Sequence, residues 1–130
     1  MPAPLGNTIT KRMPNIQVFG FEDDNATRAC LRFFRERRIV VHFVDLRKKP
    51  IAAGELRRFT DRLGAAALLD TGSRGYREQG LAYLTTDTSG ITSRLLADPR
   101  LIRLPLVRYG EEVTAGKAEA AWKAWLAKPR

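Results

Sequence analysis

Cysteine is nearly absent from this chain, since Cys30 is the only one among 130 residues. A lone cysteine cannot form an internal disulfide, and it excludes a zinc site built from paired thiolates. Histidine is equally scarce. His42 stands alone, with no pattern around it that indicates a catalytic triad or a metal site. These shortages are typical of a protein of the reducing cytoplasm that holds no metal, and we expect that location.

Long apolar runs are also missing. No window approaches the eighteen or more apolar residues that a membrane span requires. The segment 1–15 contains prolines and the basic pair Lys11-Arg12 but no apolar run, so it does not have the pattern of a signal peptide. We therefore expect no association with a membrane.

Acidic residues are few relative to basic ones, with 14 Asp and Glu against 23 Lys and Arg, which gives a net charge of +9. Such an excess favours contact with nucleic acid or another polyanion. Much of it lies between Arg28 and Lys49. Its meaning depends on how the fold distributes these side chains.

The first part of the chain predicts a βαβ unit. Residues 16–20 alternate between apolar and polar and end at a glycine, which indicates a short strand. Asp23, Asp24 and Asn25 are residue types that cap a helix start, and a helix is expected from 26 to about 37. The β-branched run at 39–44 predicts a strand buried on both faces. A crossover of this length makes the two strands parallel.

The remainder predicts short helices at 52–63, 74–83 and 91–96, a hairpin around Gly110 with strands at 104–109 and 112–113, and a closing helix at 117–127. We expect one domain at 16–127 with a helical insertion at about 52–98, between tails at 1–15 and 128–130. The predicted fold is α/β with a mixed sheet, in the order βαβ, helical insertion, ββα.

This order is that of the thioredoxin fold, and particular residues resemble the ArsC/Spx family. The family groups glutaredoxin-dependent arsenate reductases, Spx transcription regulators and YffB-like proteins. Its first strand ends in an aromatic residue, which is matched by Phe19. Its second strand ends in a Phe-x-Asp-x-Arg pattern, which is matched by Phe43, Asp45 and Arg47. Its signature before the hairpin is matched by the segment from Pro99 to Pro105.

The resemblance also shows two departures at the family's reactive site. The family's reactive cysteine lies five residues after the aromatic, where this chain has Asp24. The family's oxyanion-holding arginine, just before a proline that is usually cis, is replaced by Leu104. Arg103 lies one position earlier and is expected to point elsewhere, because neighbouring residues of an extended segment face opposite sides. We expect Asp24 to act as a helix N-cap.

Three functions follow as alternatives. The first is a catalytically degenerate, monomeric member of the family that binds a protein partner, as the resemblance to Spx implies, with Asn25, Arg28, Arg103 and Pro105 as binding candidates. The second is a thiol-dependent reductase linked to glutathione or glutaredoxin. It would have to use Cys30, which we expect to be a buried structural residue. The third is a basic nucleic-acid-binding module.

The predicted fold divides the basic residues. The strand at 39–44 spans roughly 20 Å, so it separates Arg37 and Arg38 from the group at 47–49. Arg28 and Arg32 lie on an exposed helix face between these groups, with Arg35 three residues further on. No aromatic residues that would stack on bases are interleaved with them. A solvated basic face is therefore the alternative to a nucleic-acid surface.

Overall fold

A single mixed sheet organises the protein. The computed structural model describes residues 15–80 and 87–127. The strand order is β2-β1-β3-β4. β1 (Ile16–Gly20) pairs in parallel with β2 (Val41–Asp45) and antiparallel with β3 (Leu106–Tyr109), which pairs antiparallel with β4 (Glu112–Ala115). This arrangement confirms the predicted α/β, thioredoxin-like fold.

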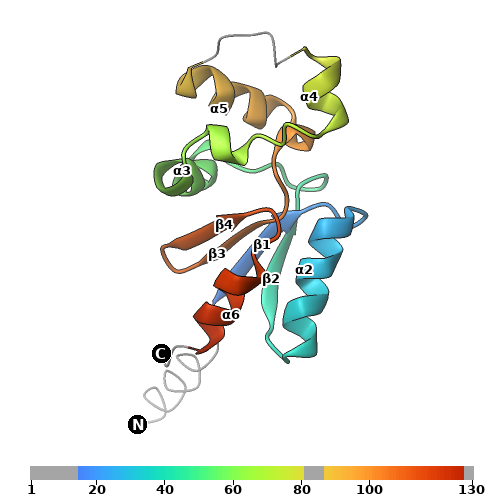
Figure 1. Ribbon diagram of the computed structural model, residues 1–130, viewed down its shortest axis with the longest axis vertical. Coiled ribbons are helices and arrows are strands. Elements are labelled where there is room, and N and C mark those ends of the chain that lie inside the picture. Colours follow the sequence, from blue (N-terminus) through green and yellow to red (C-terminus); the bar gives the residue numbers. More distant parts are fainter. Residues whose placement is uncertain (1–14, 81–86, 128–130) are drawn as a thin grey trace.

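One face of the sheet is covered by α2 (Asn25–Glu36) and α6 (Glu119–Ala127), as Figure 1 shows. The inner side of α2 places Cys30, Phe33 and Phe34 against this face, and α6 contributes two tryptophans. The ring centroids of Phe34 and Trp122 lie 5.7 Å apart. The predicted apolar periodicity of both helices therefore forms one half of the core.

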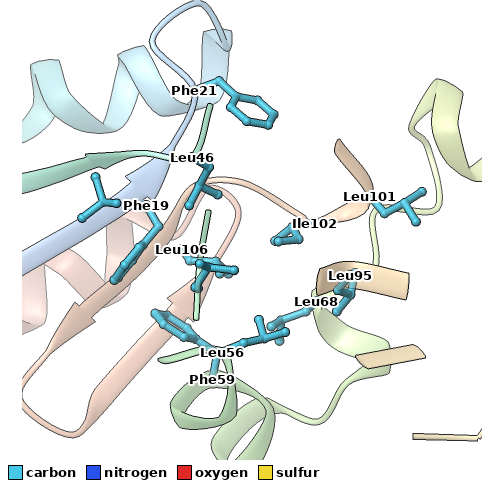
Figure 2. Packing of buried hydrophobic residues seen from close by; sticks show 12 residues of the cluster. Phe19, Phe21, Leu46, Leu56, Phe59, Leu68, Leu95, Leu101, Ile102 and Leu106 are labelled. Atoms are coloured by element: carbon cyan, nitrogen blue, oxygen red, sulfur yellow. The ribbon is translucent and has the colours of Figure 1, made fainter. Parts of the chain in front are cut away.

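The helical insertion lies between β2 and β3 in the chain and gathers at the end of the sheet where α2 begins (Figure 1). It comprises α3 (Ala53–Leu63), a short 3-10 turn at Ala66–Leu68, α4 (Arg74–Glu78), α5 (Thr88–Ala97) and a second 3-10 turn, η3 (Pro99–Leu101). Figure 2 shows the second half of the core, in which Phe19 of β1 packs in one cluster with Leu56 and Phe59 of α3 and with buried residues from the rest of the insertion. None of the helices in these two described stretches is long and apolar enough to cross a membrane.

The insertion helices differ from their predicted bounds. α5 begins at Thr88 instead of 91, because the side chain of Asp87 accepts a hydrogen bond from the Gly90 N–H at 2.8 Å and caps the helix there. α4 ends at Glu78, before the predicted end at 83. Residues 81–83 of that predicted helix lie outside the described residues.

The prediction for the second strand is wrong in one respect. β2 was expected to be buried on both faces, but it lies at the edge of the sheet, and within it Val44 alone is buried. His42 is exposed, and Val40, just before the strand, is 69% exposed. A β-branched run favours a strand without specifying how many neighbours the strand has. Only the tertiary arrangement decides that, among the described strands, β1 is the one that pairs with it.

Candidate functional site

The start of α2 is fixed by Asp24, as expected. Asp24 has an extended backbone conformation, and its carboxylate accepts hydrogen bonds from the backbone N–H of Thr27 at 2.8 Å and from the Thr27 hydroxyl at 2.7 Å. The first bond satisfies a helix N–H that has no partner within the helix, and a carboxylate at this end interacts favourably with the helix dipole. The side chain at the position that the resemblance assigns to the reactive thiol therefore holds the start of the helix.

Thr27 itself is fully buried, and it packs against β1. A Cβ atom built on Gly20 would lie 2.3 Å from the Thr27 hydroxyl oxygen and 2.7 Å from its methyl carbon. The end of β1 must therefore be a glycine, since any side chain there would displace the threonine that holds Asp24. Strand end, buried threonine and capping carboxylate form one packed unit.

Loss of the cap should be measurable. We expect Asp24→Ala to lower the free energy of unfolding by about 1–2 kcal/mol, because the cap is removed and the buried Thr27 hydroxyl loses its partner. Asp24→Asn keeps an acceptor oxygen and should cost less than about 0.5 kcal/mol. Urea denaturation of both variants checks this. Equal stabilities of the two variants would contradict the capping role.

Beside this cap lies an open hollow of about 380 Å³. The loop before α2, the segment after β2 and the segments of the insertion that flank it all contribute to its wall. Its lining combines apolar side chains with charges of both signs, and consists of Phe21, Asp23, Asp24, Ala26, Arg47, Asp70, Arg100, Ile102 and Leu104. Phe21 and Ile102 also belong to the core cluster, and Figure 2 labels both among its buried side chains. The hollow lies where the resemblance predicts the reactive site.

Each arginine of the hollow is engaged by a carboxylate. Arg47 forms an ion pair with Asp23, and its guanidinium carbon lies 4.6 Å from the centroid of the Phe21 ring. The hydrogen bond from Arg47 holds the pKa of Asp23 below its ordinary value. Arg100 donates two side-chain bonds to Asp98, at 3.0 and 2.9 Å, and these lower the pKa of Asp98. Neither guanidinium is left unpaired for an incoming anion.

The carboxylates of the hollow outnumber its guanidinium groups by three to two. Neither Asp24 nor Asp70 forms an ion pair within the described part of the chain. Asp24 is bonded to Thr27, and Asp70 accepts from the Gly72 N–H at 3.0 Å. Two carboxylates that face the same opening repel an oxyanion. The electrostatics of the hollow therefore oppose the ligand that an arsenate site must hold.

The single thiol lies away from the hollow. Cys30 occupies the inner face of α2, is fully buried and packs with the core residues of β1, β3 and α6. Burial raises the pKa of the Cys30 thiol to about 12. A thiol is nucleophilic only as its thiolate, so this side chain has neither the ionisation nor the exposure that thiol chemistry needs.

The segment before β3 contains Leu104 and Pro105, which the resemblance compares with the family's arginine and proline. The Leu104–Pro105 peptide bond is cis, and Leu104 lines the hollow. Arg103 points away from it. The aliphatic part of its side chain lies against Gly116, and its guanidinium donates to the Leu69 carbonyl at 3.4 Å. No arginine replaces the missing oxyanion ligand from this segment.

The other binding candidates lie outside the hollow. Asn25 and Arg28 are exposed on the first turns of α2, and Pro105 is buried, with its carbonyl accepting from the Gly116 N–H at 2.9 Å. A binding role for these residues stays a prediction. Sequence reasoning missed Asp70 and Arg100 as residues of the hollow. The Asp98-Pro99 pair was a usable signal for a turn at Arg100, but nothing in the sequence marked Asp70.

No group of three metal-ligating side chains comes together within residues 15–80 and 87–127. The charged residues of the hollow instead pair with one another or hold backbone N–H groups.

Solved structures share this fold. A YFFB protein superposes with a TM-score of 0.81 at 20% identity, covering 87% of this chain and 100% of its own. An ArsC family related protein from Bacteroides fragilis gives 0.77 at 16% identity, with coverages of 85% and 96%. An arsenate reductase from Vibrio cholerae gives 0.71 at 17% identity, with 80% and 91% covered. At these identities the similarity establishes the fold.

Comparison of the sequence alone matches this chain to one family. No curated protein is similar enough to match this chain. The sequence model of the ArsC family matches residues 16–125, which is most of the chain and extends from the start of β1 into α6.

Proposed function

This chain is a member of the ArsC family, and from that premise we propose that it is a catalytically degenerate member, without arsenate reductase activity, that binds a protein partner in the cytoplasm. The observation that carries the proposal is the side chain at the start of α2. Asp24 occupies the position of the family's thiol and is held as a helix cap by Thr27. A carboxylate so placed cannot attack a disulfide or form a covalent adduct with arsenate.

Two further features support the loss of catalysis. Leu104 stands where the family has its oxyanion-holding arginine, and both guanidinium groups that do line the hollow are paired with aspartates. Both changes remove positive charge that would hold the oxyanion. The anion site is therefore lost in addition to the nucleophile.

A binding role accounts for what is retained. The hollow is open, and it combines apolar walls from Phe21, Ile102 and Leu104 with fixed charges. Such a mixture is typical of a surface that recognises a partner by complementary shape and charge. The packed unit of Gly20, Thr27 and Asp24 gives this surface a rigid edge.

An activity assay tests the catalytic half of the proposal. We expect the full chain, supplied with glutathione and glutaredoxin, to reduce arsenate no faster than the same mixture without it. An authentic arsenate reductase serves as the positive control. Turnover above background that is lost in Cys30→Ala would instead establish the thiol-dependent alternative.

Labelling of the thiol is the second test. We expect Cys30 to resist a thiol probe in the native protein and to react fully once urea unfolds it, because the side chain is buried and its pKa is raised to about 12. Mass spectrometry of the labelled chain measures this. Rapid labelling under native conditions would contradict both the burial and the proposed absence of thiol chemistry.

Site-directed crosslinking tests the binding half. A photoreactive probe attached through Leu104→Cys in a Cys30→Ala background should capture a partner that the same probe on exposed Val40 does not. The captured protein is then purified, and its binding to the unlabelled chain is measured. We expect Asp70→Lys to weaken that binding at least 10-fold and Arg94→Gln, outside the hollow, to leave it unchanged. Equal affinities of the two variants would overturn the hollow as the binding surface.

A further inference from the structure

The outward face of α2 carries a row of arginines that the hollow does not use. Arg28, Arg32 and Arg35 are all exposed, and none of them makes a side-chain hydrogen bond or ion pair with another described residue. Their spacings of four and three residues place them on the same side of the helix, opposite Cys30, Phe33 and Phe34. We call these three residues the arginine row.

The regular geometry of α2 fixes the spacing of the three arginines. At about 1.5 Å of rise per residue, the row extends roughly 10 Å along the helix axis. The helix is anchored along its opposite side, where Cys30 and Phe34 are fully buried against the sheet. The three side chains therefore project from a fixed backbone, and binding would order only their own rotamers.

The described charged residues next to the arginine row do not form ion pairs with it, so its guanidinium groups can bind a ligand. Arg37 is turned aside, since its guanidinium carbon lies 3.7 Å from the Phe33 ring centroid and one of its nitrogens donates to the Phe33 carbonyl at 3.0 Å. Glu36 is exposed beside the row and forms no ion pair with a described residue. Arg28 is close enough to Asp23 to contribute to the lowered pKa of that carboxyl. Glu36 follows Arg32 at the i,i+4 spacing, but the three guanidinium groups of the row still outnumber this one carboxylate.

We propose that the arginine row binds the phosphate backbone of duplex DNA, without preference for sequence. Unpaired guanidinium groups on a rigid face match the chemistry of phosphodiesters, and the net charge of +9 favours approach of a polyanion. Single-stranded nucleic acid would need aromatic side chains on which bases stack, but both aromatic residues of α2, Phe33 and Phe34, are buried. The row lies outside the hollow, so this inference does not depend on the proposed function.

Salt-dependent binding of a labelled DNA duplex tests the proposal. The double variant Arg32→Gln/Arg35→Gln removes two contacts of the row, and Arg57→Gln/Arg58→Gln removes two exposed charges of α3 that also lack a partner within the described residues. Glutamine has nearly the helix propensity of arginine, so both variants should remain folded, and circular dichroism confirms this. The two variants have the same net charge and differ only in which face they alter.

The release of counterions from the DNA determines how strongly the affinity should depend on salt. Each phosphate contact contributes about 0.9 to the slope of log K against log salt, so losing two should reduce the slope by about 1.8. Between about 50 and 200 mM salt, the affinity of the wild-type chain should therefore fall roughly 12-fold more than that of Arg32→Gln/Arg35→Gln. The α3 variant should keep the wild-type slope.

Three outcomes would overturn the proposal. Equal changes of slope in both double variants would show that only the net charge matters. Tighter binding to a single strand of the same length than to the duplex would exclude the duplex as the occupant. Affinity for the duplex below detection at the lowest salt would remove nucleic acid as a ligand of this face altogether.

Discussion

Asp24→Cys should make this protein reactive toward thiol probes in its native state, at least 1,000-fold faster than Cys30 reacts. Cys30 is fully buried and needs the helix to open before it can be labelled, which restricts labelling to the small unfolded fraction of a protein stable by about 5 kcal/mol or more. A thiol at position 24 would lie beside the open hollow at the start of α2. Mass spectrometry measures the labelling rate of Asp24→Cys in a Cys30→Ala background. This rate is compared with the labelling rate of Cys30 in the wild-type chain.

The control for this experiment is Asp24→Ser. Serine also removes the carboxylate and can cap the helix, so it reproduces the structural change without adding a thiol. Made in the chain that keeps Cys30, it should label as slowly as the wild-type chain. If Asp24→Cys labelled no faster than Cys30, position 24 would not be the exposed start of α2, and its correspondence to the family's thiol position would be wrong.

The restored thiol should not by itself restore arsenate reduction. Leu104 supplies no charge for the oxyanion, and Arg47 and Arg100 remain paired with Asp23 and Asp98. Reactivity of the thiol without turnover would separate the loss of the nucleophile from the loss of the anion site, because each requires different residues.

Gly20→Ala should destabilise the protein by about 3 kcal/mol. The added Cβ would lie 2.3 Å from the Thr27 hydroxyl oxygen, much closer than van der Waals contact allows, and Thr27 is fully buried. Displacing Thr27 would also disturb the carboxylate of Asp24, to which the threonine donates two hydrogen bonds. Urea denaturation of the variant measures the loss of stability.

A double-mutant cycle tests this mechanism. Thr27→Ala removes the hydroxyl and methyl groups that the new Cβ would meet, so Gly20→Ala should cost at least 1 kcal/mol less in the Thr27→Ala background than in the wild-type chain. Gly54→Ala is the matched control, since nothing lies within 4 Å of a Cβ at that position. If the stability costs of Gly20→Ala and Thr27→Ala were additive, steric contact with Thr27 would be excluded as the cause.

The two predictions concern one structural unit. The family's reactive position is the first turn of a helix, where N–H groups without partners favour a negative charge. In this chain the Asp24 carboxylate lies there and accepts hydrogen bonds from Thr27, whose buried side chain in turn requires Gly20. If Asp24 corresponds to the family's thiol as proposed, that position is in this chain part of the framework that supports the hollow.

The sequence by itself determined the features that depend on neighbours along the chain. Asp24 caps α2 through a residue only three positions away, so its type and place predicted its role. The absence of a cysteine at that position and the absence of an arginine at Leu104 were also visible directly. The inner and outer faces of α2 follow from helical periodicity, which placed Cys30 inside and Arg28 and Arg32 outside.

The tertiary structure alone decided the character of the hollow. Arg47 is 24 residues from Asp23, and Asp70 and Arg100 reach the same wall through the insertion, so no local pattern predicted that they would meet. The same holds for β2, whose apolar run predicted a buried strand but whose place at the sheet edge depends on which strands pair. Capping and periodicity act within one or two helical turns. Charge pairing and burial depend instead on segments brought together by the whole fold.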